Sequence, residues 1–210
     1  MNTKEIILTS FFVLVSLFVY AFFPVNGYFQ QIFGMTIFFV ILPLLFNKIF
    51  LKRKLIFFGI DKGNWKQGII WGAISLLIIC LIFFVFSEYF GFLQKYTIPV
   101  FITKSFVNFL FYEFVVTVFF VVLYEFYFRG FLQFVFEQKI GYLAIILQAF
   151  VFFVLVLSIG GGTIYAFVPY IVCAPFAGFV AYKSRSILYS GLVQFIVLFV
   201  LNLTIIKLVK

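Results

Sequence analysis

Residues 123–130 read Leu-Tyr-Glu-Phe-Tyr-Phe-Arg-Gly and lie inside one of the most apolar stretches of the chain. The acid, Glu125, precedes the base, Arg129, by four residues, so on a helix both side chains lie on one face in the favourable order. A lone charge in hydrocarbon costs about 3 kcal/mol on insertion scales, so charged residues inside membranes usually pair or face a cavity. The stretch therefore predicts a membrane helix that carries an ion pair.

The composition places the whole chain in a membrane. Hydrophobic residues make up 66% of its 210 residues and charged residues 10%, whereas a soluble domain is about half apolar and a quarter charged. Spanning helices need roughly 20 apolar residues. The stretches that meet this requirement are 6–23, 28–46, 68–87, 106–128, 141–158, 164–181 and 187–206. We expect an all-α, polytopic membrane helix bundle of about seven transmembrane helices, with a tight turn at Gly160-Gly161-Gly162.

The net charge of +9 is a topology signal in such a protein. Most Lys and Arg residues fall in loops on one side of the predicted helices, and cytoplasmic loops are the ones enriched in these residues. We therefore expect a multi-pass protein of the plasma membrane, with a cytoplasmic N-terminus, the lipid bilayer as a partner and no nucleic acid. Residues 1–66 are expected to form a transmembrane hairpin with a basic inner loop, and residues 67–210 a helical core.

The absence of histidine limits the chemistry. No imidazole is present to bind a metal or to transfer a proton. Cys80 and Cys173 both fall in apolar segments, where we interpret them as small buried hydrophobic residues rather than a metal or disulfide pair. We expect no metal site and no cofactor.

Two of the six acidic residues, Glu113 and Glu125, lie inside an apolar helix. They are about 18 Å apart along one helix axis, too far for a paired-carboxylate site. Glu125 is expected near the end of the helix 106–128, with Arg129 at or just past the boundary. It is either an interfacial ion-pair residue or a catalytic or ligand-binding carboxylate, and the spacing alone favours the ion pair.

Three further polar side chains are expected inside helices. Glu113 is predicted to be protonated or bonded to a polar group on another helix. Gln148 and Gln194 are neutral amides of the kind that forms hydrogen bonds between membrane helices. No serine or cysteine nucleophile is recognised with a base beside it.

The Glu-x-x-x-Arg-Gly pattern at 125–130 resembles the first motif, Glu-Glu-x-x-x-Arg, of the CAAX-protease and bacteriocin-processing (CPBP, or ABI) family of intramembrane proteases. The second motif of that family is Phe-x-x-x-His on the next helix, and the third is a His with Asn or Asp four residues later. Residues 143–156 are similar to the second-motif helix, and residues 178–188 to the approach to the third motif. The resemblance covers roughly 58–202 and implies a helical peptidase scaffold in the membrane.

The positions that the resemblance assigns to water activation carry other residues. The substituted positions are Tyr124 for the first Glu, Val156 and Gln194 for the two His, and Leu198 for the Asn or Asp. Glu125 and Arg129 are the remnants of the first motif. One carboxylate, a Val and a Gln do not supply the roughly three ligands of a catalytic zinc, and an Arg partner makes Glu125 a poor base.

We therefore predict a catalytically inactive member of this family. It would act as a binding scaffold, regulator or subunit for a membrane partner, or sequester a hydrophobic peptide as bacteriocin-immunity proteins do. A cavity lined by Tyr124, Gln148 and Gln194, with Glu113 as a further binding residue, would hold a helix, a peptide or a lipid tail. The alternative is a CAAX-type endopeptidase with a non-standard active site. A transporter is disfavoured, because the sequence has no inverted repeats and no polar midplane.

Overall fold

A computed structural model describes residues 3–24, 27–159 and 164–209. The elements of this part of the chain are helices joined by turns, and no strand occurs among them, which confirms the all-α class. Six helices in it are long and apolar enough to cross a membrane, and a seventh, Leu143–Ile159, is apolar but shorter. The chain is therefore a multi-pass membrane helix bundle. The turn predicted at Gly160-Gly161-Gly162 lies outside the described residues.

The elements follow one another along the chain with short connections. In order they are α1 (Thr3–Ala21), α2 (Tyr28–Thr36), the π-helix η1 (Ile37–Ile41), α3 (Leu42–Phe46), the π-helix η2 (Asn47–Leu51), the 3-10 helix η3 (Leu55–Phe58), α4 (Trp65–Phe90), α5 (Phe92–Lys95), α6 (Val100–Thr103), α7 (Phe106–Phe111), the π-helix η4 (Tyr112–Thr117), α8 (Val118–Tyr124), the π-helix η5 (Glu125–Gln133), α9 (Phe134–Ile140), α10 (Leu143–Ile159), α11 (Ile164–Ser184) and α12 (Ile187–Val209).

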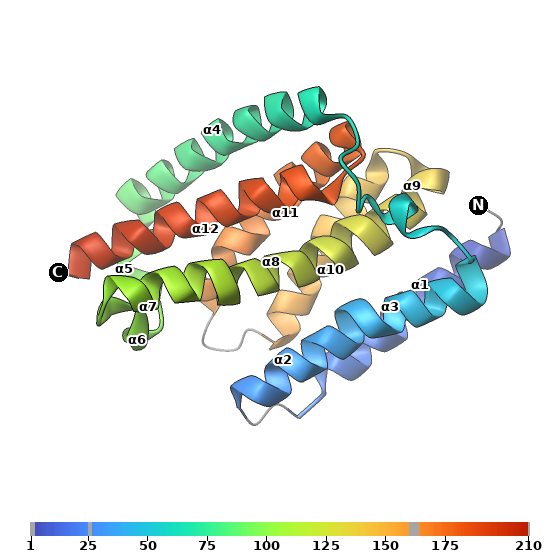
Figure 1. Cartoon of the computed structure of the whole chain (residues 1–210), viewed down its shortest axis with the longest axis horizontal. Coiled ribbons are helices and arrows are strands. Elements are labelled where there is room, and N and C mark those ends of the chain that lie inside the picture. Colours follow the sequence, from blue (N-terminus) through green and yellow to red (C-terminus); the bar gives the residue numbers. More distant parts are fainter. Residues whose placement is uncertain (1–2, 25–26, 160–163, 210) are drawn as a thin grey trace.

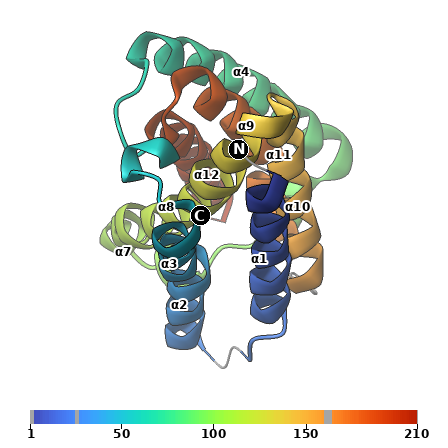
Figure 2. The ribbon, with the colours of Figure 1, turned by 90° about the vertical axis from the view of Figure 1, so that its right-hand side faces the viewer.

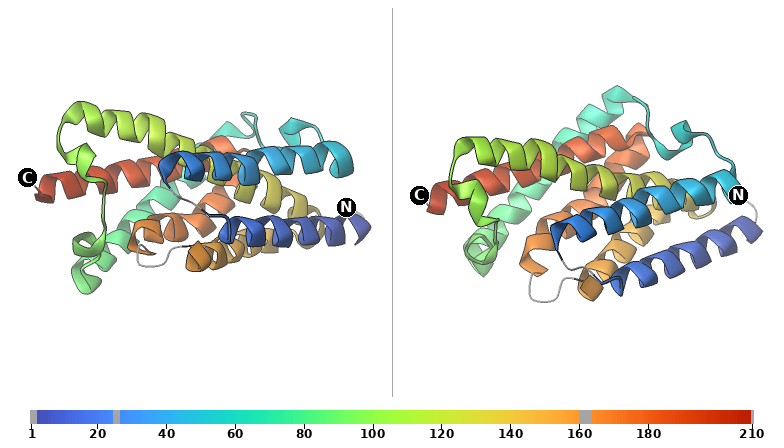
Figure 3. Two further views of the ribbon diagram at one scale, coloured as in Figure 1. Left: turned by 90° about the horizontal axis from the view of Figure 1, so that it is seen from below. Right: turned by 60° about the horizontal axis from the view of Figure 1, so that its bottom comes forward.

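The two chain termini lie at opposite ends of the bundle (Figures 1 and 3). We call these the N end, which also carries η3 and α9, and the C end, which carries α5, α6 and α7. The helix α4 and the pair α1 and α2–α3 form opposite edges of the bundle in both the side view and the end view (Figures 1 and 2). The helices α8 and α12 lie between these edges, and each carries both buried residues and residues exposed at the surface of the bundle.

The helix expected at 106–128 is longer than predicted. The elements from α7 to α9 are continuous over Phe106–Ile140, a span of 35 residues. The helix ends at Gly141, whose φ of 57° is readily adopted only by glycine. The prediction that Arg129 lies at the helix boundary is therefore wrong. The prediction ended the helix at the charged Arg129. Because Arg129 pairs with Glu125, the helix continues past it through the interior of the bundle.

Two apolar clusters hold the bundle together. The larger one joins α1, η1, η5 and α10, and the smaller one joins α4, α5, α11 and α12. The larger cluster crosses the predicted division at residue 66, because the ring of Phe39 packs 5.8 Å from that of Tyr124. The division into two domains stays a prediction.

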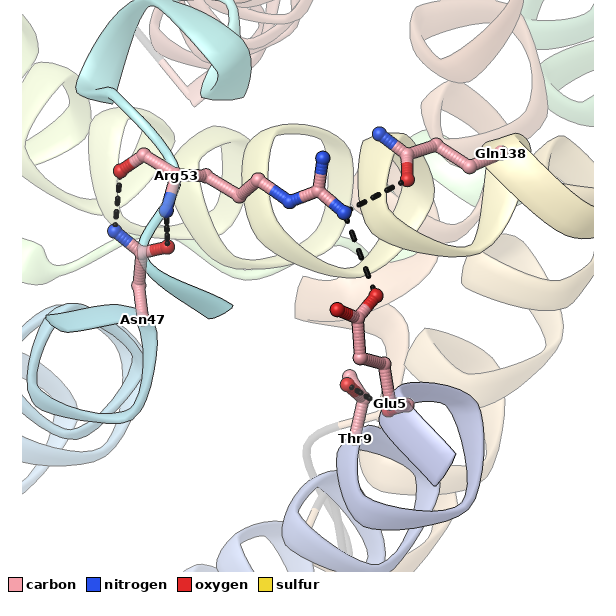
Figure 4. A network of polar contacts seen from close by, with 5 residues as sticks. All are labelled: Glu5, Thr9, Asn47, Arg53 and Gln138. Atoms are coloured by element: carbon pink, nitrogen blue, oxygen red, sulfur yellow. Dashed lines mark hydrogen bonds and ion pairs between the residues drawn. The ribbon is translucent and has the colours of Figure 1, made fainter. Parts of the chain in front are cut away.

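Arg53 ties the first helices to the N end of the bundle (Figure 4). Its backbone exchanges two hydrogen bonds with the side chain of Asn47, at 2.9 and 3.0 Å. Its guanidinium reaches Glu5 Oε2 at 3.4 Å and Gln138 Oε1 at 3.3 Å. The Glu5 pair is about one-third exposed, so it adds at most about 1 kcal/mol. Its main effect is to fix α1 and η2 against α9.

Candidate functional site

Both buried acids of the long helix lie at the start of a π-helical segment. Glu113 is the second residue of η4, and Glu125 is the first residue of η5. Hydrogen bonds in a π-turn close over five residues instead of four, and such turns are frequent at functional sites. In η5, a Cβ added to Gly130 would lie 2.9 Å from the carbonyl oxygen of Phe58. This close approach holds the η5 segment against η3.

Glu125 and Arg129 form a buried ion pair. The Oε1 of Glu125 lies 3.6 Å from Nη1 of Arg129, and the two side chains are 2% and 1% exposed. Ser190 on α12 donates its hydroxyl to Oε2 of Glu125 at 2.5 Å. Buried charges are tolerated when they are paired and further hydrogen-bonded. The network therefore fastens the long helix to α12 in the interior of the bundle.

Ser190 corrects the expectation that no serine stands beside a base. Sequence reasoning missed it because only the packing of α12 brings it to Glu125. The side chain is fully buried, and its hydroxyl also lies 3.0 Å from the carbonyl oxygen of Ile187. The available signal was the adjacent Gly191, because small residues mark contacts between membrane helices. A Cβ on Gly191 would lie 3.4 Å from Cγ of Glu125.

The positions of the first and second motifs meet in the larger apolar cluster. The ring of Tyr124 packs edge-on against the rings of Phe152 and Tyr170, both at 5.4 Å between centroids. Val156 follows Phe152 by one turn on α10 and belongs to the same cluster. The structure thus brings Tyr124, Phe152 and Val156 together, and aromatic and aliphatic packing occupies the place between them.

The two predicted glutamines differ in their contacts. Gln148 donates Nε2 to the carbonyl oxygen of Ala174 on α11 at 2.8 Å, which confirms the interhelical hydrogen bond expected of it. Gln194 is 1% exposed, and its Oε1 has no hydrogen-bond partner among the described residues. A third amide that the sequence did not single out, Gln133, donates to the carbonyl oxygen of Gly178 at 2.8 Å.

Glu113 belongs to a second polar network, nearer the C end. Its Oε1 accepts a hydrogen bond from Nδ2 of Asn202 on α12 at 2.6 Å, so it is bonded to another helix, one of the two predicted alternatives. The Oδ1 of Asn202 accepts from the hydroxyl of Tyr96 at 2.9 Å. Burial raises the pKa of the Tyr96 phenol far above its usual value, with Tyr112 and Glu113 adding to the effect. The phenol therefore stays neutral and keeps its proton for Asn202.

Two hollows flank α8, and the adjacent residues Tyr124 and Glu125 line different ones. The first, the C-end hollow, has a volume of about 150 Å³ and is lined by Gln31, Tyr96, Thr97, Ile98, Pro99, Tyr112, Thr117, Phe120, Tyr124, Ala166, Phe167, Tyr170, Leu198 and Asn202. The second, the lateral groove, has a volume of about 520 Å³ and is lined by Val40, Leu44, Leu55, Ile60, Val118, Val121, Val122, Glu125, Phe126, Ile187, Leu188, Gly191, Leu192 and Phe195. Gln148, Gln194 and Glu113 line neither, so their binding role stays a prediction. Val156, a substituted catalytic position, also lines neither.

The donor set does not fit a catalytic zinc. Such a site takes about three protein ligands from His, Cys or carboxylates, and no group of three or more of these residues gathers in the part of the chain that is described. Cys173 is buried as expected, but Cys80 is exposed. The prediction for Cys80 is wrong because α4 is an edge helix, and an apolar segment at an edge turns part of its surface to lipid.

Comparison with known proteins points to one family. Residues 106–200 match the family model described as type II CAAX prenyl endopeptidase Rce1-like. A search of curated proteins found no match, and a search of solved structures found none. The matched residues contain the long helix, α10, α11 and the part of α12 that carries Ser190 and Gln194. This match and the first-motif remnant at Glu125 and Arg129 both support membership of the CPBP family of CAAX-protease-like membrane proteins.

Proposed function

We propose that this chain is a catalytically inactive family member that binds a hydrophobic peptide or the membrane segment of a partner protein. The observation that carries the proposal is the packing of Tyr124, which occupies the position of the first Glu in the family motif. Its ring is packed against Phe152 and Tyr170. A phenol held in this way supplies neither a carboxylate base nor a metal ligand to the hollow beside it.

The two buried carboxylates of the long helix, Glu113 and Glu125, are engaged elsewhere. Glu125 is shared between Arg129 and Ser190, and Glu113 is held by Asn202. A general base must have a substrate proton or a water within hydrogen-bond reach, and both side chains are at most 2% exposed. Their arrangement supports a structural role for the Glu125 pair rather than hydrolysis.

The lateral groove is the proposed binding surface. Glu125 is the charged residue among its lining side chains, and the others are aliphatic, aromatic or glycine. Its volume of about 520 Å³ falls inside the range of about 300–1,000 Å³ typical of ligand sites. The groove lies between α3, α8 and α12, so an extended apolar chain in it would contact both the hairpin and the core. Binding of such a ligand is also compatible with the role of a regulator, a subunit or an immunity-type protein.

One observation favours the rival function, an endopeptidase with a non-standard site. The hydroxyl of Ser190 lies 2.5 Å from Glu125, which is the contact expected between a nucleophile and its base. Against it stand the complete burial of Ser190 and the guanidinium of Arg129 on the same carboxylate. The experiment below decides between the two functions.

The test uses the purified full-length protein in lipid nanodiscs and a fluorescent farnesylated peptide that ends in a CAAX sequence. We expect saturable binding by fluorescence anisotropy and no shortened peptide by mass spectrometry. Leu192→Trp should weaken binding about tenfold, a loss of about 1.4 kcal/mol, because Leu192 lines the groove. The matched control is Leu81→Trp, at an equally lipid-exposed position of α4. Release of a C-terminal tripeptide, or no binding, would overturn the proposal.

We also infer that the N end faces the cytoplasm of the cell that carries the protein in its plasma membrane. Basic residues are concentrated in the connections at this end, and the bias remains when the buried Arg129 is left out. In a Cys80→Ser background, we expect Lys207→Cys to react with an impermeant maleimide in intact cells and Lys4→Cys to react only after lysis. The opposite pattern would reverse the orientation.

A further inference from the structure

The C-end hollow has the size and walls of a site for one small group. Its volume of about 150 Å³ is below the range for drug-sized ligands and corresponds to about five water molecules of roughly 30 Å³ each. Four tyrosines line it, and they come from different parts of the chain: Tyr96, Tyr112, Tyr124 and Tyr170. The faces of such aromatic rings carry partial negative charge.

A buried carboxylate without a cation stands next to this hollow. Glu113 is fully buried, and Asn202, which does line the hollow, donates to its Oε1. Its Oε2 has no hydrogen-bond partner within the described residues. The ion pairs found in that part of the chain use Glu5, Glu125 and Glu137, and Glu113 is in none of them. A buried carboxylate of this kind is stabilised strongly by a nearby positive charge.

The basic residue next to Tyr96 in the sequence is directed away from Glu113. The Nζ of Lys95 lies over the ring of Tyr165, 5.5 Å from its centroid. Glu113, by contrast, accepts a hydrogen bond from Asn202, whose Oδ1 accepts from the hollow-lining phenol Tyr96. The lining of the hollow therefore holds four tyrosine rings and no basic side chain, and the Glu113 carboxyl lies directly behind Asn202.

Two hydrogen-bond donors of the wall are already used inside the protein. The Tyr96 hydroxyl donates to Asn202, and the Asn202 amide donates to Glu113. An anion entering the hollow would meet the charge of Glu113 without these donors. A cation would gain from that charge and from the aromatic rings, because cation–π contacts are strongest with desolvated ligands.

We propose that the C-end hollow binds a quaternary ammonium group, with Glu113 as its counter-ion and Tyr170 and Tyr124 as its aromatic wall. A quaternary ammonium fits better than a primary amine, because it needs no hydrogen-bond acceptors and gains its affinity from charge and π-contacts. The ligand is either a free cation of the choline class or the choline headgroup of a lipid. This site is separate from the lateral groove and does not depend on peptide binding there.

Equilibrium dialysis with radiolabelled choline tests the proposal on the full-length protein in phosphatidylglycerol nanodiscs, which contain no choline headgroup. We expect saturable, stoichiometric binding that tetramethylammonium displaces and an equal concentration of sodium does not. Glu113→Gln should weaken the affinity by about tenfold or more, and Tyr170→Leu by about fivefold or more. The matched control is Glu88→Gln, the same change on the exposed surface of α4, and it should bind as the parent protein does.

Repeating the dialysis in phosphatidylcholine nanodiscs separates the two sources. Free choline binding that is lost there identifies the lipid headgroup as the ligand, and unchanged binding identifies the soluble cation. No saturable binding in phosphatidylglycerol, or displacement by sodium, would overturn the proposal. If Glu113→Gln fails to fold by circular dichroism, Tyr170→Leu decides, and unchanged affinity in that variant would overturn it. Leu192→Trp should not change choline binding. The peptide-binding proposal and the choline-binding proposal can therefore fail independently of each other.

Discussion

The two buried acids of the long helix have the same side chain, similar burial and a similar place in a π-helical segment, but different partners. Glu125 has a cation one turn away, Arg129, and a hydroxyl from α12. Glu113 has an amide from the same helix α12 and no cation in the described part of the chain. The carboxyl of Glu125 thus has a cation as a partner inside the protein, whereas the carboxyl of Glu113 has only an amide among the described residues.

This difference separates a structural site from a site that can take a ligand. An internal ion pair fixes the distance between two helices and leaves little free energy to be gained from a third group. An unbalanced carboxylate gains free energy from an external cation, and it lies beside a hollow that can admit one. The remnant of the family motif is thus the closed site, and the acid outside the motif is the open one.

The same substitution at both acids should have the largest difference in effect. Glu125→Gln leaves the buried Arg129 without its counter-ion, and we expect a loss of about 3–5 kcal/mol in the free energy of unfolding. Glu113→Gln leaves no cation unpaired and keeps an oxygen to accept from Asn202, so we expect a loss of less than about 1 kcal/mol. Equilibrium unfolding in dodecyl sulfate–detergent mixtures, followed by circular dichroism, measures both.

A second variant separates charge from packing at Glu125. Adding Arg129→Met to Glu125→Gln removes the unpaired cation, so the double variant should be more stable than Glu125→Gln alone. Equal losses at Glu113 and Glu125 would contradict the contrast between a balanced and an unbalanced carboxylate. Further destabilisation in the double variant would show that Arg129 acts by its volume.

The next largest loss of stability is expected when the hydroxyl of Ser190 on α12 is removed. Ser190→Ala removes a hydrogen bond to a charged group, which is worth about 1.5–3 kcal/mol, and we expect a loss of that size in the same unfolding assay. Ser158→Ala is the matched control, because Ser158 is exposed and its hydroxyl bonds only to the carbonyl oxygen of Val154 in its own helix. Its effect should stay within about 0.5 kcal/mol. Equal effects would argue against the Glu125 contact.

The sequence was sufficient for the features that depend on local chemistry. Apolar length predicted the spanning helices, and the four-residue spacing predicted the pair of Glu125 and Arg129, which the structure confirms at 3.6 Å. The motif at 125–130 also indicated the family that the match over 106–200 supports. Each of these features is encoded within one helix or one short motif.

The features that failed or were missed depend on contacts between distant segments. Ser190 and Asn202 look like ordinary polar residues of α12, and only its packing against the long helix places them on the two acids. The prediction placed the helix end at Arg129 because a hydropathy scale gives a charged residue the same value whether it is paired or exposed. Tyr124 and Leu198 line one hollow, and the binding role expected of Gln148 and Gln194 stays a prediction.

The smallest effect expected concerns the π-segment that begins at Glu125. A Cβ on Gly130 would lie 2.9 Å from the Phe58 carbonyl oxygen, and this backbone atom cannot rotate away. We therefore expect Gly130→Ala to cost about 1–2 kcal/mol in the unfolding assay. Gly72→Ala is the control in a regular helix, where the new Cβ would lie 3.4 Å from Cγ2 of Val193, and alanine should be neutral or stabilising by about 0.5 kcal/mol. If both substitutions stabilise, the contact with η3 does not hold the segment, and the ion pair alone fixes Glu125.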